Sequence, residues 1–561
     1  MTPLLLAAAA QAAPEPDISR ALALVDWLGW AASDRAVAQY VAEAHEPRGP
    51  FGVSLREPDR DRLREDEAAP LYAVEGTLDE VHLHGTTFVL AQLREAVVYT
   101  NPASVPLHGL ALRVFPNGQD LRHHGAEIEG VWVDDRPAPF EIDGTILSVD
   151  LDPPLAPGKT ARILLHLMEQ VPPFDPRQPL TEAIDPEATG TFGRADGWLN
   201  LGYWLPVVTP VDKRGRFDIR PLKPNAEHAM FDPALFHVVL NTPASLAVAT
   251  TGVETSRVVD GERATTIAVA GWARDFAVAL VPDGRVLTGK VGSTRIRVVH
   301  AGGSDQGAHL LEYAERAVRV YTERFGPLAE AELDVVEAPL RQLGAVSYPG
   351  LVAVDTSHQG VPYHRSAAHE WALAHEIAHQ WWGDEVGNDP ATTPWLDEGL
   401  AAHAASVYWL ERYGQDALDM RNTLGITGRL RKIQAQGRAD LPANRPAWEY
   451  DLDQYAAVVY GRSALFFDQV HRLLGDQRFY GALGRYHDRF AGRFATPDDL
   501  LAELAAATDR DGAAQLAVLY TRWITEAHAF EDLVEEPAAD DAPQADADDA
   551  APRAARHPRA P

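Results

Sequence analysis

The spacing of apolar residues changes once along this chain, and that change most constrains its fold. Between about Leu71 and Gly289, short runs rich in β-branched and aromatic residues alternate with turn residues, which is typical of an antiparallel all-β domain. From about Ala308 onward, apolar residues recur at helical intervals instead. The sequence therefore predicts an α+β chain in which a β-rich domain precedes a mostly helical one.

Changes in residue composition and in the spacing of apolar residues divide the chain into five segments. Helical spacing also precedes the β-rich runs, and a stretch rich in Pro and Gly separates the two. The final segment is acidic and too poor in apolar residues to fold, so we expect it to be disordered. The predicted segments are a signal-like terminus at 1–13, a helical segment and linker at 14–70, a β-rich domain at 71–289, a helical domain at 290–530 and the tail at 531–561.

The N-terminus resembles a secretory signal in part. Residues 4–10 are apolar, and Ala10-Gln11-Ala12 fits a small-residue cleavage site, but no basic residue precedes the apolar run. A signal peptide and an ordinary alanine-rich terminus both fit this pattern. The protein is expected to be periplasmic or secreted in the first case and cytoplasmic in the second.

Composition excludes several classes of function. With 50 Lys and Arg against 81 Asp and Glu, the formal net charge is −31 and no basic cluster is present, so we expect no nucleic-acid partner. No apolar run is long enough to cross a bilayer. The chain has no cysteine, which excludes disulfides, thiolate ligands and cysteine nucleophiles. Any bound metal must therefore be held by His, Asp and Glu.

One such set stands in the helical half. His375-Glu376-Ile377-Ala378-His379 lies inside a predicted helix from Ser366 to Trp382. Two histidines four residues apart project from one face of a helix and can bind a single ion. Glu376 is placed to reach a water on that ion without ligating it.

A third ligand makes the pattern more specific. Glu398 follows His379 by 19 residues, and Pro394 is placed to start a second helix with Glu398 in its first turn. Two His and one Glu with a fourth position left for water form a catalytic zinc set, whereas the alternative is an ion pair between helices. Nearby polar residues are interpreted as capping or packing residues: His369, Glu370 and His403.

The charges of this set predict its chemistry. One Zn²⁺ held by two neutral imidazoles and one carboxylate keeps positive charge, so it lowers the pKa of a bound water to about 7 and polarises a carbonyl. Glu376 would accept the proton of that water and pass it to the leaving nitrogen. The ligand set thus predicts metal-assisted hydrolysis.

These residues resemble a known family. The segments 374–382 and 395–401 are similar to the two zinc segments of gluzincin metallopeptidases, specifically the membrane alanyl aminopeptidase family that includes leukotriene A4 hydrolase. The resemblance implies a saddle-like β domain followed by a thermolysin-like catalytic domain, as in bacterial members. It also implies a peptide or protein substrate. Weaker matches to the β domain are 98–101, 155–158, 201–206 and 273–276.

The resemblance also implies a role for Tyr460. The segment 459–465 resembles a family segment whose tyrosine donates a hydrogen bond to the tetrahedral oxyanion, and Tyr460 matches that tyrosine. The match is loose, because Arg462 stands where the family has Lys and Ser463 where it has Gly. The alternative for Tyr460 is a core or capping residue.

The loop expected to bind substrate departs from the family. Residues 344–350 read Gly-Ala-Val-Ser-Tyr-Pro-Gly, and Ser347 replaces the glutamate that binds the substrate's free α-amino group in the family. Ser347 and Tyr348 are the predicted substrate-binding residues. Because serine cannot pair with an ammonium as a carboxylate does, strict aminopeptidase specificity is in doubt.

Three functions remain open at this stage. The first is a zinc peptidase with relaxed or non-aminopeptidase specificity. The second is a peptide-binding scaffold that keeps the fold without turnover, which the exchange at Ser347 favours and the intact zinc set opposes. The third is a metallohydrolase acting on a non-peptide ligand. The sequence does not predict an oligomeric state.

Overall fold

The computed structural model describes residues 23–534 except 84, 119–124, 178–188, 224, 226–229, 304–305, 342 and 356–366. The signal-like terminus at 1–13 lies outside these residues, so the predicted location of the protein stays a prediction. The tail lies outside them from residue 535 onward. Within the described part of the chain, no helix is both long and apolar enough to span a membrane.

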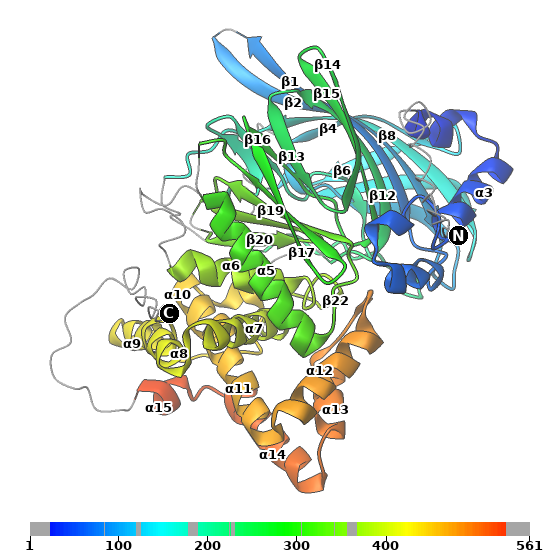
Figure 1. Ribbon diagram of the computed structural model, residues 1–561. Coiled ribbons are helices and arrows are strands. Elements are labelled where there is room, and N and C mark those ends of the chain that lie inside the picture. The colour runs from blue at the N-terminus through cyan, green and yellow to red at the C-terminus, as the bar shows by residue number, and fades with distance from the viewer. Residues whose placement is uncertain are drawn as a thin grey trace, which may run out of the picture.

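The β-rich half is built around an eight-stranded sheet of order β14-β15-β12-β1-β2-β8-β4-β5 (Figure 1). Neighbouring strands are antiparallel except β1 and β12, which run parallel. A tight turn between two strands requires them to be antiparallel. These two strands are far apart in sequence, so no such turn joins them and they can pair in parallel. The strands are β1 (Leu71–Leu83), β2 (Thr86–Thr100), β4 (Ala126–Val133), β5 (Arg136–Pro137), β8 (Thr160–Val171), β12 (Ala234–Pro243), β14 (Val253–Asp260) and β15 (Arg263–Ala273).

Two four-stranded sheets complete this half, with orders β13-β16-β10-β9 and β11-β3-β7-β6. Together with the large sheet they enclose one apolar core, in which Trp204 is fully buried. The strands are β3 (Leu107–Arg113), β6 (Phe140–Asp143), β7 (Ile146–Leu155), β9 (Phe192–Ala195), β10 (Trp198–Leu201), β11 (Val207–Val208), β13 (Leu246–Thr250) and β16 (Val278–Pro282).

The N-terminal segment packs on the large sheet. Its apolar residues, including Leu28 and Tyr40, form a separate cluster with Ala73, Val98 and Leu164 of β1, β2 and β8. The helical segment predicted before the β domain is present, and it covers a sheet face that would otherwise be exposed. Its elements are α2 (Leu24–Asp26), η1 (Trp27–Ala31), α3 (Asp34–Ala44), η2 (Gly52–Ser54) and η3 (Glu57–Arg64).

The second half begins with a five-stranded sheet that helical spacing did not predict. Its order is β17-β18-β19-β21-β20, and β18, β19 and β21 are parallel. The domain boundary predicted between residues 289 and 290 falls inside β17. The whole of β17 pairs with β18, so this strand belongs to the second half. Strand β20 forms one edge of the sheet. The strands are β17 (Arg285–Val291), β18 (Thr294–His300), β19 (Glu332–Ala338), β20 (Ala345–Tyr348) and β21 (Leu351–Asp355).

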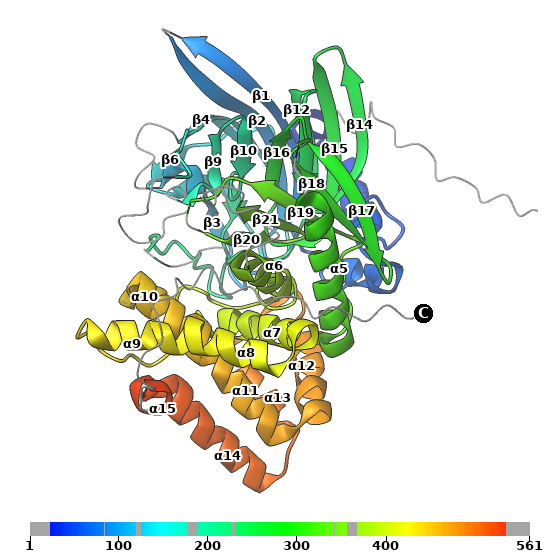
Figure 2. The ribbon, with the colours of Figure 1, turned by 60° about the vertical axis from the view of Figure 1, so that its left-hand side comes forward.

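Helices make up the rest of this half, and α6 lies between the five-stranded sheet and α7 (Figure 2). Three helices coincide closely with those predicted around 366–382, 396–413 and 463–474, so the expected α+β architecture is confirmed. The helices are α5 (Gln306–Phe325), α6 (Ala367–His379), α7 (Trp395–Tyr413), α8 (Gln415–Asn422), α9 (Gly428–Ala435), α10 (Leu452–Gln454), α11 (Ser463–Leu474), α12 (Asp476–Phe490), α13 (Pro497–Ala506), α14 (Arg510–Tyr520) and α15 (Ala529–Val534).

The last helix corrects the predicted start of the tail. Residues 531–534, expected to be disordered, are the end of α15. Ala529, Phe530 and Leu533 pack with Leu430 and Ile433 of α9, so this segment has an apolar face that its acidic composition conceals.

A buried ion cluster joins the two halves. Arg297 on β18 lies 2.9 Å from Asp334 and 3.3 Å from Glu332, both on β19. The same guanidinium donates to the main-chain oxygen of Val248 on β13, and Asp334 accepts the main-chain N–H of Thr250. The cluster therefore connects the five-stranded sheet to a sheet of the β-rich half.

Replacing Arg297 with methionine should destabilise the protein strongly, because removing one partner of a buried ion pair leaves the carboxylates without a counter-charge. We expect a loss of about 3–5 kcal/mol, measured as a lower urea midpoint. The matched control is Arg295→Met, whose side chain pairs with the same Glu332 but is 48% exposed. That change should cost less than about 1 kcal/mol. Equal losses of stability in Arg297→Met and Arg295→Met would show that the buried ion pairs of Arg297 do not hold the two halves together.

Candidate active site

Helix α6 carries both histidines of the H-E-x-x-H string in its C-terminal half. Leu373 and Ile377 are fully buried and anchor the helix in the apolar core. Glu370 in its first turn accepts hydrogen bonds at 2.6 Å from the hydroxyls of Tyr408 and Tyr413 on α7. Glu370 therefore fixes α6 against α7, in agreement with its interpretation as a packing residue.

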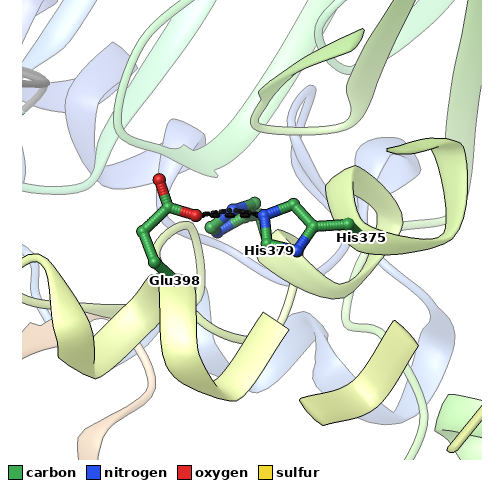
Figure 3. Close-up of side chains that lie close together, drawn as sticks. All are labelled: His375, His379 and Glu398. Atoms are coloured by element: carbon green, nitrogen blue, oxygen red, sulfur yellow. Dashed lines mark hydrogen bonds and ion pairs between the residues drawn. The ribbon is translucent and has the colours of Figure 1, made fainter. Parts of the chain in front are cut away.

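Glu398 comes from the first turn of α7, which begins at Trp395 directly after Pro394. Its carboxylate faces both imidazoles (Figure 3). Oε2 of Glu398 lies 3.0 Å from Nε2 of His375 and 3.3 Å from Nε2 of His379, and the two Nε2 atoms are 3.1 Å apart. The three predicted metal ligands thus converge on one point.

This donor set fits a zinc ion. Tetrahedral zinc with bonds of about 2.1 Å separates its ligand atoms by about 3.4 Å, close to the three distances observed. Nδ1 of His379 lies 2.9 Å from the main-chain oxygen of Trp382. A hydrogen bond from Nδ1 leaves the lone pair on Nε2, the atom that faces the other ligands. Among the described residues, these three make up the one group of His, Asp and Glu side chains close enough to share an ion.

The charges of the site suit a cation as well. Burial opposes ionisation of Glu398, but hydrogen bonds from the two histidines outweigh it and hold its pKa at about 2. Burial lowers the pKa of His375. Burial acts in the same direction on His379, yet the hydrogen bond and charge of Glu398 outweigh it and raise the pKa of that imidazole. The ionised carboxylate thus attracts positive charge to this point. Without a metal that charge is a proton on His379, and a zinc ion bound to Nε2 would take the place of the proton.

Tyr460 lies beside these ligands. Its ring centroid is 5.2 Å from that of His375, and it sits in η8 (Tyr455–Arg462), a π-helical segment that runs directly into α11. Burial, followed by the charge of Glu398, raises the pKa of Tyr460 well above its usual value, so its hydroxyl is a donor. The sequence placed Tyr460 just before a helix, whereas the structure places it inside a wider helical turn.

Comparison with known proteins agrees with this geometry. Residues 311–523, which contain all three ligands and Tyr460, match the peptidase family M1 domain. This part of the chain is thus a peptidase family M1 domain.

Relatives of this chain include Aminopeptidase M1-A of Oryza sativa subsp. japonica, which is 28% identical over 242 residues, covering 41% of this chain and 26% of the relative. Aminopeptidase N of Lactobacillus helveticus is 28% identical over 220 residues, covering 36% of this chain and 25% of the relative. The matched region thus spans about a quarter of these relatives. The M1 zinc metallopeptidase from Deinococcus radiodurans shares the fold, with a TM-score of 0.57 and 22% identity over 80% of this chain and 93% of that one.

The candidate site opens into a pocket between the two halves of the molecule. Glu376 lines this pocket together with His379, Glu398 and Tyr460. Helices supply the metal-binding residues of the lining, and the β-rich half supplies others. Residues of the β-rich half in the lining are Thr189, Thr191, Tyr203, Asn225, Arg274 and Asp275.

Both predicted substrate-binding residues lie on β20 and line the same pocket. Tyr348 is buried, and its ring packs on Tyr203 at 5.4 Å. Gly202 makes room for it, because a Cβ there would lie 2.1 Å from the Tyr348 hydroxyl oxygen. Ser347 makes a different kind of contact, since its hydroxyl lies 3.3 Å from Oδ2 of Asp384.

Sequence reasoning missed Asp384 and Arg274 in the pocket lining and the buried Gln380 behind it. Gln380 donates to Oγ of Ser347, to the main-chain oxygen of Tyr348 and to Oδ2 of Asp384, at 2.9–3.0 Å. Gln380 directly follows the H-E-x-x-H string and Asp384 stands five residues after it, so their proximity to the string was the signal that could have identified them. Arg274 was part of a weaker match, with no role assigned.

Proposed function

We propose that this chain is a zinc-dependent peptidase that hydrolyses peptide bonds with the aid of one metal ion. The observation that carries the proposal is the convergence of His375, His379 and Glu398 at a pocket also lined by Glu376 and Tyr460. Aminopeptidases among the relatives and a zinc metallopeptidase with the same fold support it.

The residues of the site have separate roles in this proposal. Zinc, when bound, supplies a Lewis acid that polarises the peptide carbonyl and makes a water acidic enough to lose a proton near neutral pH. Glu376 accepts that proton and returns it to the leaving nitrogen. Tyr460 donates a hydrogen bond to the oxyanion that forms from the peptide carbonyl.

The edge strand β20 is where we place the substrate main chain. Within the described residues, β20 pairs with β21 alone. An extended peptide can hydrogen-bond to such an edge as an added strand. Ser347 and Tyr348 on β20 line the pocket that holds Glu376, so a peptide in this position has a bond within reach of the metal site.

The scaffold and the non-peptide hydrolase remain as outcomes of the test. A scaffold needs neither a converged ligand set nor a carboxylate beside it, which favours the peptidase. The test is hydrolysis of a fluorogenic alanine peptide by the zinc-loaded protein. Cleavage that disappears with a chelator and returns with zinc supports the proposal. If no peptide in a mixed library is cleaved, the peptidase function is wrong.

Zinc should also stabilise the folded chain, because the three ligands are brought together only by folding. At a free zinc concentration 1,000 times Kd, linkage predicts a gain of about 4 kcal/mol, seen as a higher melting temperature than in chelator. His379→Ala should lose most of this gain and most of its bound zinc. The control is His82→Ala, an exposed residue of β1 that should behave as wild type. If zinc raises the melting temperature of His379→Ala as much as that of wild type, zinc does not bind at the proposed site.

A further inference from the structure

The accessible face of the zinc helix continues past the metal site. Helix α6 is mostly buried, but Trp371, Ala372, Glu376 and His379 each keep part of their surface exposed. Residues three or four apart project from one side of a helix, so these side chains share a face. Glu376 and His379 line the pocket at one end of this face, and Trp371 lies at the other end, one turn before the ligand His375. A peptide bound along this face can therefore extend beyond the metal ligands.

The edge strand β20 runs alongside the same face. Gly344, directly before β20, is so close to α6 that a Cβ there would lie 2.9 Å from the Cβ of Ala372. At the other end of β20, Oγ of Ser347 accepts a hydrogen bond from Gln380 at 3.0 Å. Strand and helix therefore run in the same direction. An added peptide pairs more stably when it is antiparallel, so its residues on the carboxyl side of the cleaved bond lie toward Ala372 and Trp371.

An arginine lies at this end of the path. The guanidinium of Arg421, in the last turn of α8, lies over the ring of Trp371, with 3.2 Å between Cζ and the ring centroid. Gly425 leaves room for it, because a Cβ there would lie 3.3 Å from Nη1. Burial is the main cause that lowers the pKa of His375, and the charge of Arg421 acts in the same direction. Arg421 is therefore close enough to the metal site to act on one of its ligands.

Among the described residues, no carboxylate pairs with Arg421. The charged group that acts on it is another cation, Arg429 of α9. Burial, followed by this like charge, lowers the pKa of Arg421 to about 9, so the guanidinium stays protonated near pH 7. Buried charges in proteins are usually paired, and this chain has 81 Asp and Glu against 50 Lys and Arg. An arginine without such a partner at the end of the substrate path indicates an anion that binds from outside.

We propose that Arg421 binds a carboxylate of the substrate on the carboxyl side of the cleaved bond. The inference rests on the proposed peptidase function and names a class of substrate for it. A helical turn spans about 5.4 Å and a strand rises about 3.4 Å per residue, so Trp371, one turn beyond His375, lies about two residues after the bond. The carboxylate is the C-terminus of a peptide that ends there or the side chain of an Asp or Glu in that position. A guanidinium can form two parallel hydrogen bonds with either.

The test compares three tripeptides: Ala-Ala-Gln amide, the same peptide with a free carboxyl end, and Ala-Ala-Glu amide. Chromatography measures cleavage of the first bond, which has two residues after it. The zinc-loaded wild type should cleave at least one charged peptide with a kcat/KM about 10- to 100-fold above that of the neutral amide. The peptide that is preferred identifies the source of the carboxylate. Equal kcat/KM for all three would overturn the inference and leave the peptidase function intact.

Arg421→Met should remove this preference, because methionine keeps an apolar contact with Trp371 and loses the charge. The charge of Arg421 also acts on His375, so the quantity to compare is the ratio of kcat/KM between charged and neutral peptides, in which an effect on the metal site cancels. Arg421→Lys retains the charge and should keep part of the preference. The matched control is Arg431→Met, an exposed change on α9 that should leave the ratio as in wild type. An unchanged ratio in Arg421→Met would overturn the inference.

Binding tests the inference without turnover. In the zinc-loaded Glu376→Gln protein, calorimetry should show tighter binding of the preferred charged peptide than of the neutral amide. Adding Arg421→Met should remove that difference. If wild type cleaves none of the three peptides, the peptidase function fails, and this binding comparison alone decides the role of Arg421. Equal affinities for all three peptides before Arg421 is changed would overturn that role.

Discussion

Replacing Glu376 with glutamine should lower kcat for peptide hydrolysis by about 10²- to 10⁴-fold. Glutamine has nearly the shape of glutamate but cannot accept a proton from water. Glu376 lies one residue after His375 on α6 and lines the pocket, so the change removes the proposed proton acceptor without removing a ligand. The measurement is steady-state hydrolysis of the fluorogenic peptide at saturating concentration.

Zinc content and melting temperature of the same variant provide the internal control. Both should equal those of wild type, because the three ligands are unchanged. Glu262→Gln, an exposed position in the turn between β14 and β15, is the matched substitution and should keep full activity. A Glu376→Gln protein that retains zinc and hydrolyses peptide at more than a tenth of the wild-type rate would show that another group transfers the proton.

The local parts of the structure could be predicted from the sequence. Helical spacing around His375 and His379 gave the zinc helix within a few residues, and Pro394 marked the start of the helix that presents Glu398. These elements are predictable because periodicity and helix-start residues act over a few turns. The metal ligands could be found because two of them share one helical face.

The parts that depend on contacts distant in sequence could not be predicted. The five-stranded sheet lies among helices, and its short buried strands resemble buried helix segments in composition. The contact between Ser347 and Asp384 joins an edge strand to a turn 37 residues later. Arg274 reaches the same turn from the β-rich half, 110 residues earlier. Such contacts follow from how the layers pack, which spacing along one segment does not report.

The departures around Tyr460 have a structural explanation. Arg462 is fully buried and donates to the main-chain oxygen of Arg522, so it holds η8 against a neighbouring helical segment. Ser463 is also fully buried and packs against Gly399 of α7, where an added Cβ would come within 2.7 Å. The residues that depart from the family segment thus support the position of Tyr460, whose role in hydrolysis stays a prediction.

Replacing Tyr460 with phenylalanine should therefore lower kcat by about 100- to 1,000-fold, corresponding to about 2.7–4 kcal/mol for one oxyanion donor. Phenylalanine keeps the ring contacts with His375 at 5.2 Å and Tyr455 at 5.5 Å and removes the hydroxyl alone. Because the donor acts mainly on the oxyanion and little on the bound peptide, KM should change little. Zinc content should also be unchanged, since no ligand is altered.

Tyr455 offers the matched control for this prediction. It is a buried tyrosine of the same π-helical segment and lines the same pocket, but it lies about one π-helical turn before Tyr460, farther along η8 from α11. Tyr455→Phe removes an equivalent hydroxyl and should reduce kcat by less than about 10-fold, as expected for a hydrogen bond that does not strengthen in the transition state. Equal losses in the two variants would mean that Tyr460 supports the helix rather than the oxyanion. A large loss confined to Tyr460→Phe would place the oxyanion between its hydroxyl and the metal ligands.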